Sequence, residues 1–177
     1  MIEFKRITTK DEALYAFMEQ LMVASFPAEE YRDLNELRTF TDTKERFYNN
    51  IIFDNNQPIG LITYWDFDGF YYVEHFAIDP AHRNGGIGKR ALESIFQQLD
   101  GGIILEVEEP VEEMAQRRIN FYKRLGFKLW DKPYLQPPYR KGDDYLPLLL
   151  MAHGDLDADK LFENIKLTIY KEVYNIL

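Results

Sequence analysis

The sequence predicts an α/β (α+β) fold: a mixed, mostly antiparallel central sheet is flanked by helices, with one helix added at the C-terminus. Three observations support it. Strand-like and helix-like runs alternate along the chain. Strand signals at 47–53, 58–67 and 70–78 are joined by short polar turns, which is typical of antiparallel neighbours. An apolar stripe at helical spacing then occupies 157–177, after the last strand signal.

Length and composition favour a single domain spanning residues 1–177. The chain is 46% hydrophobic and 15% aromatic, which is enough for a sizeable core and excludes the disordered class. It contains no run of ~20 apolar residues and begins without the apolar stretch of a signal peptide, so we expect a cytoplasmic protein with no membrane partner. The absence of cysteine excludes disulfides, a cysteine nucleophile and a cysteine-based metal site, and we expect no metal.

The net charge of the chain indicates which classes of molecule we expect it to bind. The formal net charge is −9, whereas nucleic-acid binding needs clustered Lys and Arg, so we expect no nucleic-acid partner. Acidic surroundings favour a cationic acceptor such as an amine.

The N-terminal part begins with a short strand at 2–7. A capping box between Thr9 and Glu12 predicts the start of the first helix, whose apolar residues recur at helical spacing. Phe26-Pro27 is expected to end that helix, and 34–40 to form a shorter second one.

A meander of antiparallel strands follows. The strands at 47–53 and 58–67 are joined by the polar residues 54–57. Asp68-Gly69 is a strong tight-turn signal leading into the strand at 70–78.

The remaining elements continue the alternation. A helix at 87–99 is followed by a strand at 103–108. The next helix has acidic residues first and basic residues last, which complements its dipole, and Gly126 is its natural C-terminal stop. Two further strands are expected at 127–133 and 145–151.

The C-terminal extension, 157–177, is expected to be a helix capped by Asp157. Its apolar stripe favours packing on the domain's own core, with a homodimer contact as the alternative, so we expect a monomer or a homodimer. The members of the stripe are Phe162, Ile165, Ile169, Val173 and Ile176, widened by Tyr170 and Tyr174.

The most informative segment is Arg83-Asn84-Gly85-Gly86-Ile87-Gly88, at a strand-to-helix junction. Glycines there let the backbone approach a ligand, and the first N–H groups of a helix have no intrahelical partner. Together with the helix dipole they favour a phosphate group, to which Lys89 adds positive charge.

Two phosphate-binding patterns fit this segment poorly. A nucleotide triphosphate loop fails because Arg83 and Arg90 stand where a glycine and a hydroxyl are required. The dinucleotide fingerprint G-x-G-x-x-A is matched at 86–91, with Glu106 about twenty residues further on, but a polar linker separates it from the strand and little chain remains for further βαβ units. Dinucleotide binding is therefore kept only as a remote alternative.

The third pattern is Arg-x-x-Gly-x-Gly at 83–88, after a strand ending at Ile78. It resembles the acetyl-coenzyme A loop of the GNAT superfamily of N-acetyltransferases. Residues 120–127, Asn-Phe-Tyr-Lys-Arg-Leu-Gly-Phe, look like that superfamily's helix ending in Tyr-x-x-x-Gly-Phe. Leu105-Glu106-Val107 between them resembles the strand of enzymes that acetylate protein N-termini. The three segments fall in the expected order.

The resemblance implies acetyl-CoA (coenzyme A) as co-substrate. It implies that the loop backbone binds the pyrophosphate, that the strand at 70–78 receives the pantetheine arm, and that an N–H on that strand faces the oxyanion. The residues so implied in cofactor binding are Phe76, Ala77, Ile78, Arg83, Asn84, Gly85, Gly86, Ile87, Gly88 and Lys89.

Tyr122 is the implied catalytic acid, because the resemblance places it where these enzymes protonate the leaving sulfur. A phenol with an ordinary pKa of about 10 remains protonated at neutral pH. The alternative is a helix tyrosine packed on the core. Ala115 and Arg118 depart from the superfamily's Asn-x-x-Ala pattern, so no cofactor contact is assigned there.

Three residues compete as catalytic base. Glu106 matches the carboxylate of the Leu-Glu-Val pattern, and strand alternation places it on one face with Ile104 and Glu108. Glu74 could act through a water, and a neutral His75 has a suitable pKa. Solvent could also take the amine's proton.

The acceptor site is expected between the segment after the first helix and the segment after 127–133. The residues we expect to bind substrate are Tyr31, His75, Tyr134 and Tyr139. Aromatic and charged residues in these segments suit a small-molecule or peptide amine.

We therefore expect an acetyl-CoA-dependent N-acetyltransferase acting on a primary amine. The absence of cysteine favours direct attack in a ternary complex over a cysteine-bound acyl intermediate. The alternative is a non-catalytic acyl-CoA-binding sensor or scaffold, which would keep the glycine loop without needing Tyr122 or a carboxylate.

Overall fold

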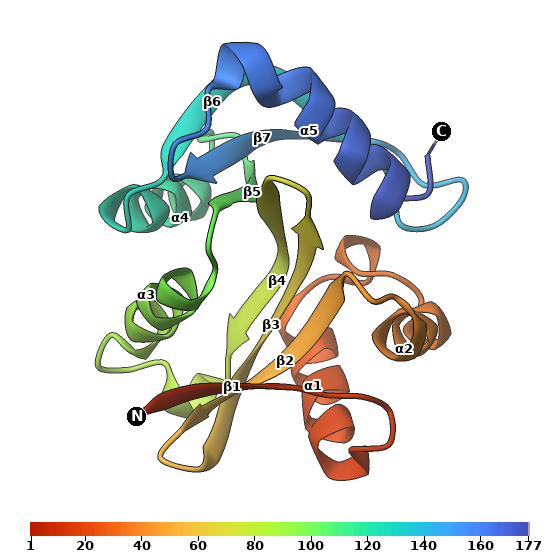
Figure 1. Ribbon diagram of the computed structural model, residues 1–177, viewed down its shortest axis with the longest axis vertical. Helices are drawn as coiled ribbons and strands as arrows, with labels where there is room; N and C mark the ends of the chain where they lie inside the picture. The colour runs from red at the N-terminus through yellow and green to blue at the C-terminus, as the bar shows by residue number, and fades with distance from the viewer. Residues whose placement is uncertain (177) are drawn as a thin grey trace. The chain divides into compact units, whose positions relative to one another are not determined.

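In the computed structural model, which describes residues 1–176, the chain forms two compact units, Met1–Asp100 (unit 1) and Gly101–Leu177 (unit 2). Each combines antiparallel strand pairs with helices, which confirms the predicted fold class (Figure 1). That residues 1–177 act as one domain stays a prediction. Within the described residues, no helix has the length and apolar character needed to cross a bilayer.

Unit 1 contains four strands and their covering helices. In chain order its elements are β1 (Ile2–Arg6), α1 (Glu12–Ser25), the 3-10 turn η1 (Ala28–Glu30), α2 (Leu34–Thr43), β2 (Phe47–Asp54), β3 (Gln57–Phe67), β4 (Phe70–Ile78), the 3-10 turn η2 (Pro80–His82) and α3 (Ile87–Gln98). The strands follow the order β1-β2-β3-β4. In Figure 1, α1 and α2 lie on one face of these strands and α3 lies on the other.

The two hairpin turns of unit 1 form as the sequence predicts. Asn55 and Asn56, between β2 and β3, have φ angles of 49° and 66°, in the left-handed region that asparagine tolerates. Gly69, between β3 and β4, has a φ of 94°. These turns set the register of the three strands.

A β-bulge at Glu74 changes the pattern within β4. Thr63 of β3 lies opposite His75, whereas the next residue of β3, Tyr64, lies opposite Val73, so Glu74 is the extra residue. A bulge breaks the simple alternation of faces. As a result, the side chains of both Glu74 and His75 turn toward the residues that follow α1.

The predicted capping box at the start of α1 is wrong. The helix begins at Glu12, and its N-cap, Asp11, makes no side-chain cap bond. The Thr9 hydroxyl donates instead to Asp42 of α2 at 2.5 Å, and the Thr9 N–H donates to the same carboxylate at 2.9 Å. A capping box would need the Thr9 hydroxyl, which is instead bonded to Asp42. The predicted end of the helix at Phe26 is confirmed.

Unit 2 contains three strands and two helices. Its elements are β5 (Gly102–Glu108), α4 (Glu113–Arg124), β6 (Lys128–Gln136), β7 (Leu146–His153) and α5 (Ala158–Glu172). The strands follow the order β5-β7-β6, so β6 and β5 are both paired to β7. Strand β6 extends three residues beyond the predicted end at Pro133, because a register shift between Trp130 and Tyr134 accommodates the proline.

Both helices of unit 2 end or begin as the sequence predicts. The Gly126 N–H donates to the Lys123 carbonyl at 3.0 Å, and the Phe127 N–H donates to the Tyr122 carbonyl at 3.1 Å. With Gly126 at a φ of 94°, these two bonds form a Schellman stop. Asp157 caps α5 by accepting hydrogen bonds from the next turn.

The apolar stripe of α5 is buried, but the helix is shorter than predicted. Phe162, Ile165 and Ile169 are buried and face inward. The helix ends at Glu172, and Asn175, with a φ of 55°, turns the chain away before Ile176. Leu177, the last residue of the predicted extension, lies outside the described residues.

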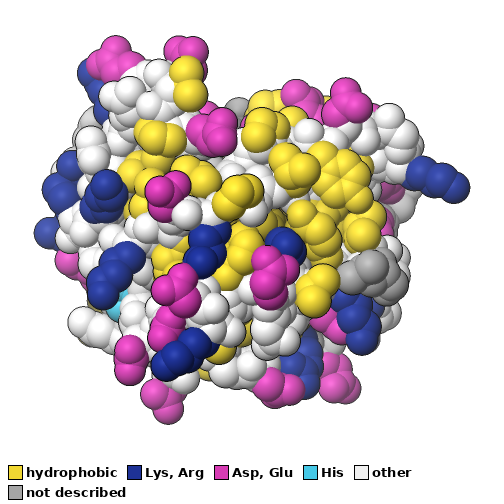
Figure 2. Space-filling model, turned by 90° about the horizontal axis from the view of Figure 1, so that it is seen from above, with side chains coloured by type: hydrophobic (Ala, Val, Ile, Leu, Met, Phe, Trp, Pro, Cys, Tyr) yellow, Lys and Arg dark blue, Asp and Glu magenta, His cyan; other side chains and the backbone are white. Residues whose placement is uncertain are grey.

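Acidic and basic side chains are interspersed over the face shown in Figure 2, with apolar side chains grouped between them. On this face neither sign of charge is gathered in one patch.

Candidate functional site

The glycine loop of unit 1 joins η2 to α3. Gly85 and Gly86 have φ angles of 75° and 72°, and Gly86 is the N-cap of α3. Glycines with left-handed φ angles just before a helix bring the chain directly to its N-terminus, where the first backbone N–H groups favour an anion. The Arg83 guanidinium donates from Nε to the Ile78 carbonyl at 2.8 Å, which ties the loop to the end of β4.

The packing of unit 1 does not require a glycine at Gly88, the second residue of α3. A Cβ built there would lie 3.8 Å from the side chains of Phe76 and Ile78, an ordinary contact distance. Its neighbours leave room for a methyl group. The glycines of this loop therefore leave space and unpaired helix N–H groups in front of α3, which fits a pyrophosphate.

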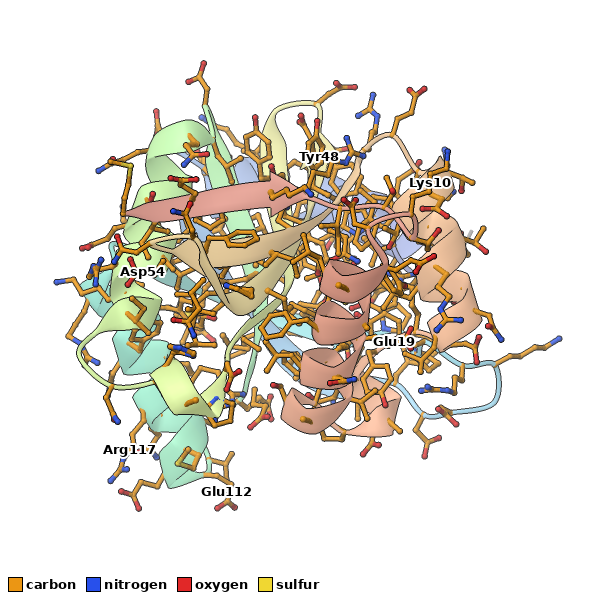
Figure 3. All side chains as sticks on the ribbon, turned by 90° about the horizontal axis from the view of Figure 1, so that it is seen from below. Lys10, Glu19, Tyr48, Asp54, Glu112 and Arg117 are labelled. Carbon is orange, nitrogen blue, oxygen red and sulfur yellow. The ribbon has the colours of Figure 1, made fainter. Side chains whose placement is uncertain are left out.

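A cleft of about 310 Å³ opens beside the loop. Asp54, labelled in Figure 3, lies at the end of β2 and forms ion pairs with Arg90 of α3 at 3.6 Å and with the N-terminal amine at 3.2 Å. The residues that line the cleft are Asp54, Ile59, Ala81, His82, Asn84, Gly85, Ile87 and Arg90.

The Glu74 carboxylate is held inside unit 1. The Arg32 guanidinium forms an ion pair with its Oε1, and the Trp65 indole N–H donates to its Oε2 at 2.7 Å. The side chains of Arg32 and Glu74 are 2% and 1% exposed, respectively. Both oxygens of Glu74 thus have donors from within unit 1.

His75 is also held by its neighbours. Its Nε2 lies 2.7 Å from the Glu30 carbonyl, which can only accept, so Nε2 carries the proton and donates it. Its Nδ1 lies 3.5 Å from the Thr63 hydroxyl. Burial lowers the pKa of His75, which keeps the ring neutral. Tyr31, predicted to bind substrate, is buried and stands between Glu30 and Arg32, which contact His75 and Glu74 respectively.

In unit 2, three side chains donate to the Glu106 carboxylate on β5. Tyr134 of β6 donates to Oε1, and the Gln136 amide donates to Oε2 at 2.7 Å. The Tyr174 hydroxyl, from the turn after α5, lies 2.9 Å from Oε2 and 3.2 Å from Oε1. Burial and the adjacent Glu106 carboxylate raise the pKa of Tyr134, so its phenol stays a donor.

Tyr122 lies on α4, outside this cluster. Its ring packs edge-on against Phe121 and Phe127, with centroids 5.3 Å and 5.4 Å away. The Schellman stop of α4 fixes its backbone through the Phe127 N–H. Burial raises the pKa of Tyr122 to about 12, so the phenol keeps its proton throughout the neutral range.

The structure thus groups the predicted residues within each unit. Glu74 and His75 share the segment around Tyr31 in unit 1, whereas Tyr134 bonds to Glu106 in unit 2. The ring of Tyr139 packs against Tyr174, with centroids 5.0 Å apart. Among residues 1–176, no cluster of three or more His, Asp or Glu side chains is arranged to hold a metal ion.

Two contacts of these carboxylates were not predicted from the sequence. Arg32 lies in the segment after the first helix, where the sequence predicts one wall of the acceptor site, and Tyr174 is predicted only on the apolar face of the last helix. A signal existed for Tyr174, because a buried tyrosine hydroxyl usually has a hydrogen-bond partner. Nothing in the sequence indicates which residue that partner is.

Comparison with known proteins gives a consistent result. A model described as the acetyltransferase (GNAT) family matches residues 12–127. A solved GNAT-family acetyltransferase from Bacteroides thetaiotaomicron is 60% identical, with 99% of each chain covered and a TM-score of 0.97. The ribosomal-protein-S18-alanine N-acetyltransferase of Escherichia coli is 20% identical, with 86% of this chain and 93% of that chain covered and a TM-score of 0.60.

A GNAT-family acetyltransferase from Elizabethkingia anophelis, solved with acetyl-CoA bound, is 14% identical. It matches 86% of this chain and 97% of its own, with a TM-score of 0.58. These last two likenesses show the fold alone. No curated protein matches the chain.

Proposed function

Because this chain belongs to the GNAT acetyltransferase family, we propose that it transfers an acetyl group from acetyl-CoA to a primary amine of a small molecule or peptide, by direct attack in a ternary complex. Family membership supports acetyl transfer in general. We add to it the class of acceptor, a primary amine, and the mechanism, direct attack in a ternary complex.

The observation that carries the proposal is the glycine loop at the start of α3. Two left-handed glycines and the open space at Gly88 suit a pyrophosphate held by backbone N–H groups. We assign pyrophosphate binding to residues 83–89 and assign the pantetheine arm to the backbone of 76–78. When bound, acetyl-CoA supplies the activated acetyl group as a thioester.

Tyr122 is assigned to the leaving sulfur. With a pKa of about 12, its phenol is a weaker acid than an ordinary thiol, whose pKa is about 8.5. Complete proton transfer from Tyr122 to a free thiolate is therefore uphill, and we expect the phenol to act chiefly by donating a hydrogen bond to the sulfur as negative charge develops there.

Glu106 is assigned as the proton acceptor for the attacking amine. Glu74 and His75 are less suited to this role. Glu74 already forms an ion pair with Arg32, and the Nε2–H of His75 already donates to the Glu30 carbonyl. The donors on Glu106 named above are uncharged, so its negative charge is not cancelled by them. A carboxylate in that state attracts an ammonium group and can receive its proton.

The acceptor is proposed only as a class. The Escherichia coli relative is named for the N-terminal residue alanine of a ribosomal protein, but at 20% identity this likeness is one of fold. We place Tyr31, His75, Tyr134 and Tyr139 near the acceptor, as the sequence suggests, and extend the class to peptide N-termini and small amines.

The test begins with calorimetric titration of acetyl-CoA, with NAD as the control ligand. Micromolar binding of acetyl-CoA alone supports the proposal, and no binding would make the 83–88 loop a structural turn. Turnover is then followed as free coenzyme A released with a panel containing spermidine, glucosamine, lysine and an alanyl peptide. Tyr122→Phe is expected to bind acetyl-CoA normally and to turn over at least tenfold more slowly.

Binding without turnover on any amine would instead favour a non-catalytic acyl-CoA-binding module. Unchanged turnover in Tyr122→Phe would remove Tyr122 from the mechanism. The experiments therefore test the role of Tyr122 and the binding of acetyl-CoA independently of each other.

A further inference from the structure

The hydrogen atoms around Glu106 can be placed in one consistent way. Gln136 has two amide hydrogens, one for Glu106 Oε2 at 2.7 Å and one for the Tyr174 hydroxyl oxygen at 2.9 Å. The Tyr174 hydroxyl, having accepted one bond, donates its own hydrogen to Glu106. Tyr134 donates the third hydrogen, to Oε1. This arrangement uses each hydrogen once and requires Glu106 to be the acceptor throughout.

Tyr174 is held rigidly enough to orient a carboxylate. It is 7% exposed and follows Val173, which is 1% exposed. The N–H of Val173 donates to the Ile169 carbonyl at 2.9 Å, and the chain then closes through a 2.9 Å bond from the Ile176 N–H to the Tyr170 carbonyl. A side chain fixed by a closed turn loses little entropy when it donates a hydrogen bond.

The helix that carries Tyr174 is itself fixed to β6. The ring of Phe162 packs on Trp130 at a centroid distance of 6.3 Å. One turn before Tyr174, the Tyr170 hydroxyl donates to the Leu135 carbonyl. The Phe162–Trp130 packing fixes α5 on the strand that carries Gln136, whereas the exposed Tyr170 bond contributes little to this placement.

Tyr134, Gln136 and Tyr174 lie beyond residue 127, where the match to the family model ends. They come from β6 and from the turn after α5, whereas Glu106 itself lies within the matched part. A segment outside the matched region therefore supplies the immediate surroundings of the proposed proton acceptor.

We propose that Tyr174, together with Gln136 and Tyr134, is a positioning residue that holds the Glu106 carboxylate aimed for the amine acceptor, so that the C-terminal extension forms part of the acetyl-transfer site. The inference rests on the proposed role of Glu106. Three hydrogen-bond donors make a carboxylate a weaker base. They also fix its orientation, and a fixed orientation favours proton transfer from a correctly placed amine.

The test compares two identical chemical changes on one helix. Tyr174→Phe removes a hydroxyl that bonds to Glu106, and Tyr170→Phe removes one that bonds to the Leu135 carbonyl. Each is measured for kcat and KM on the panel amine with the highest turnover, for acetyl-CoA affinity by calorimetry, and for Tm. We expect kcat to fall roughly tenfold in Tyr174→Phe, the loss typical of one hydrogen bond to a charged group, with acetyl-CoA affinity unchanged. We expect Tyr170→Phe to stay within about twofold of the wild-type kcat.

Coupling to Glu106 separates positioning from a general loss of packing. In a Glu106→Gln background, Tyr174→Phe is expected to lower kcat by less than about twofold, because the carboxylate that it orients has been replaced by an amide that cannot take the amine's proton. An undiminished tenfold loss in that background, or equal effects of the two Tyr→Phe changes, would overturn the proposal while leaving Glu106 in place. Wild-type turnover in Glu106→Gln alone would overturn the role of Glu106, and the role of Tyr174 with it.

Discussion

Replacement of Arg32 by Met tests the buried ion pair of unit 1. The Arg32 guanidinium lies against the Glu74 carboxylate and 4.3 Å from the centre of the Phe40 ring. Methionine retains much of the apolar stem that packs on this ring and removes the charge. The change therefore leaves a carboxylate that is 1% exposed without the cation that faces it.

The expected cost is large compared with the stability of a domain. Removing one partner of a buried ion pair typically costs about 3–5 kcal/mol, because the remaining charge stays desolvated. Native domains are stable by only about 5–15 kcal/mol, so Arg32→Met should come close to unfolding unit 1 at 37 °C. The double variant Arg32→Met, Glu74→Gln should recover most of the loss, since a neutral amide can still accept from the Trp65 indole.

Urea denaturation followed by circular dichroism and by fluorescence measures these changes. The two tryptophans lie in different units, Trp65 in unit 1 at 1% exposure and Trp130 in unit 2 at 5%, so a Trp130→Phe background reports on unit 1. Arg38→Met is the matched control, because its ion pair with Glu19 is half-exposed and should contribute little. If Arg32→Met costs no more than Arg38→Met, or if the double variant is merely additive, the reasoning is refuted.

Three further variants probe the loop, a buried histidine and a helix cap. Gly88→Ala should leave Tm unchanged or raised yet weaken acetyl-CoA binding at least tenfold, whereas Gly60→Ala should cost roughly 1–3 kcal/mol, because its Cβ would lie 2.5 Å from the Ala77 carbonyl oxygen. Burial lowers the pKa of His75 below its ordinary 6.5, so the unfolded chain gains a proton that the folded chain does not. The neutral His75 ring therefore contributes its full stability to the fold above pH 6.5, and this contribution is lost as the pH falls below 6.5. We expect Tm, measured from about pH 7.5 to 5, to fall less in His75→Gln than in the wild type. Asp33→Ala should cost about 1 kcal/mol in urea, since Asp33 accepts the Asn35 N–H at 2.9 Å at the start of α2; a loss below about 0.3 kcal/mol would contradict that role.

Features encoded by neighbouring residues were predictable from the sequence. Strand β4 spans Phe70–Ile78 as predicted, and α3 and α4 end within a residue or two of their predicted stops. The turn at Gly69 and the stop at Gly126 form because glycine adopts a left-handed φ at little cost. The glycine loop at 83–88 belongs to the same class, because the left-handed φ angles of Gly85 and Gly86 arise from consecutive residues.

Features that depend on distant partners were not predictable. The pairing of Thr9 with Asp42 displaced a local capping box. The bulge at Glu74 depends on how β3 and β4 align, and simple alternation along β4 would put the neighbours Glu74 and His75 on opposite faces. In each case a contact with a residue distant in the sequence determines which way the side chain points and which partner it bonds to.

The two candidate carboxylates illustrate how such contacts decide chemistry. From sequence, Glu106 is distinguished from Glu74 only by its match to the Leu-Glu-Val pattern: each is an acidic residue within a strand, for which an unpaired buried state is too costly. In the structure, Glu74 faces a full positive charge on Arg32, whereas Tyr134, Gln136 and Tyr174 give Glu106 neutral donors. An ion pair cancels charge and stabilises the fold, while neutral donors orient a charge that can still attract a cation. That difference is why we assign stability to Glu74 and proton acceptance to Glu106, and why residues after 127 matter to a site whose recognisable motifs all lie before it.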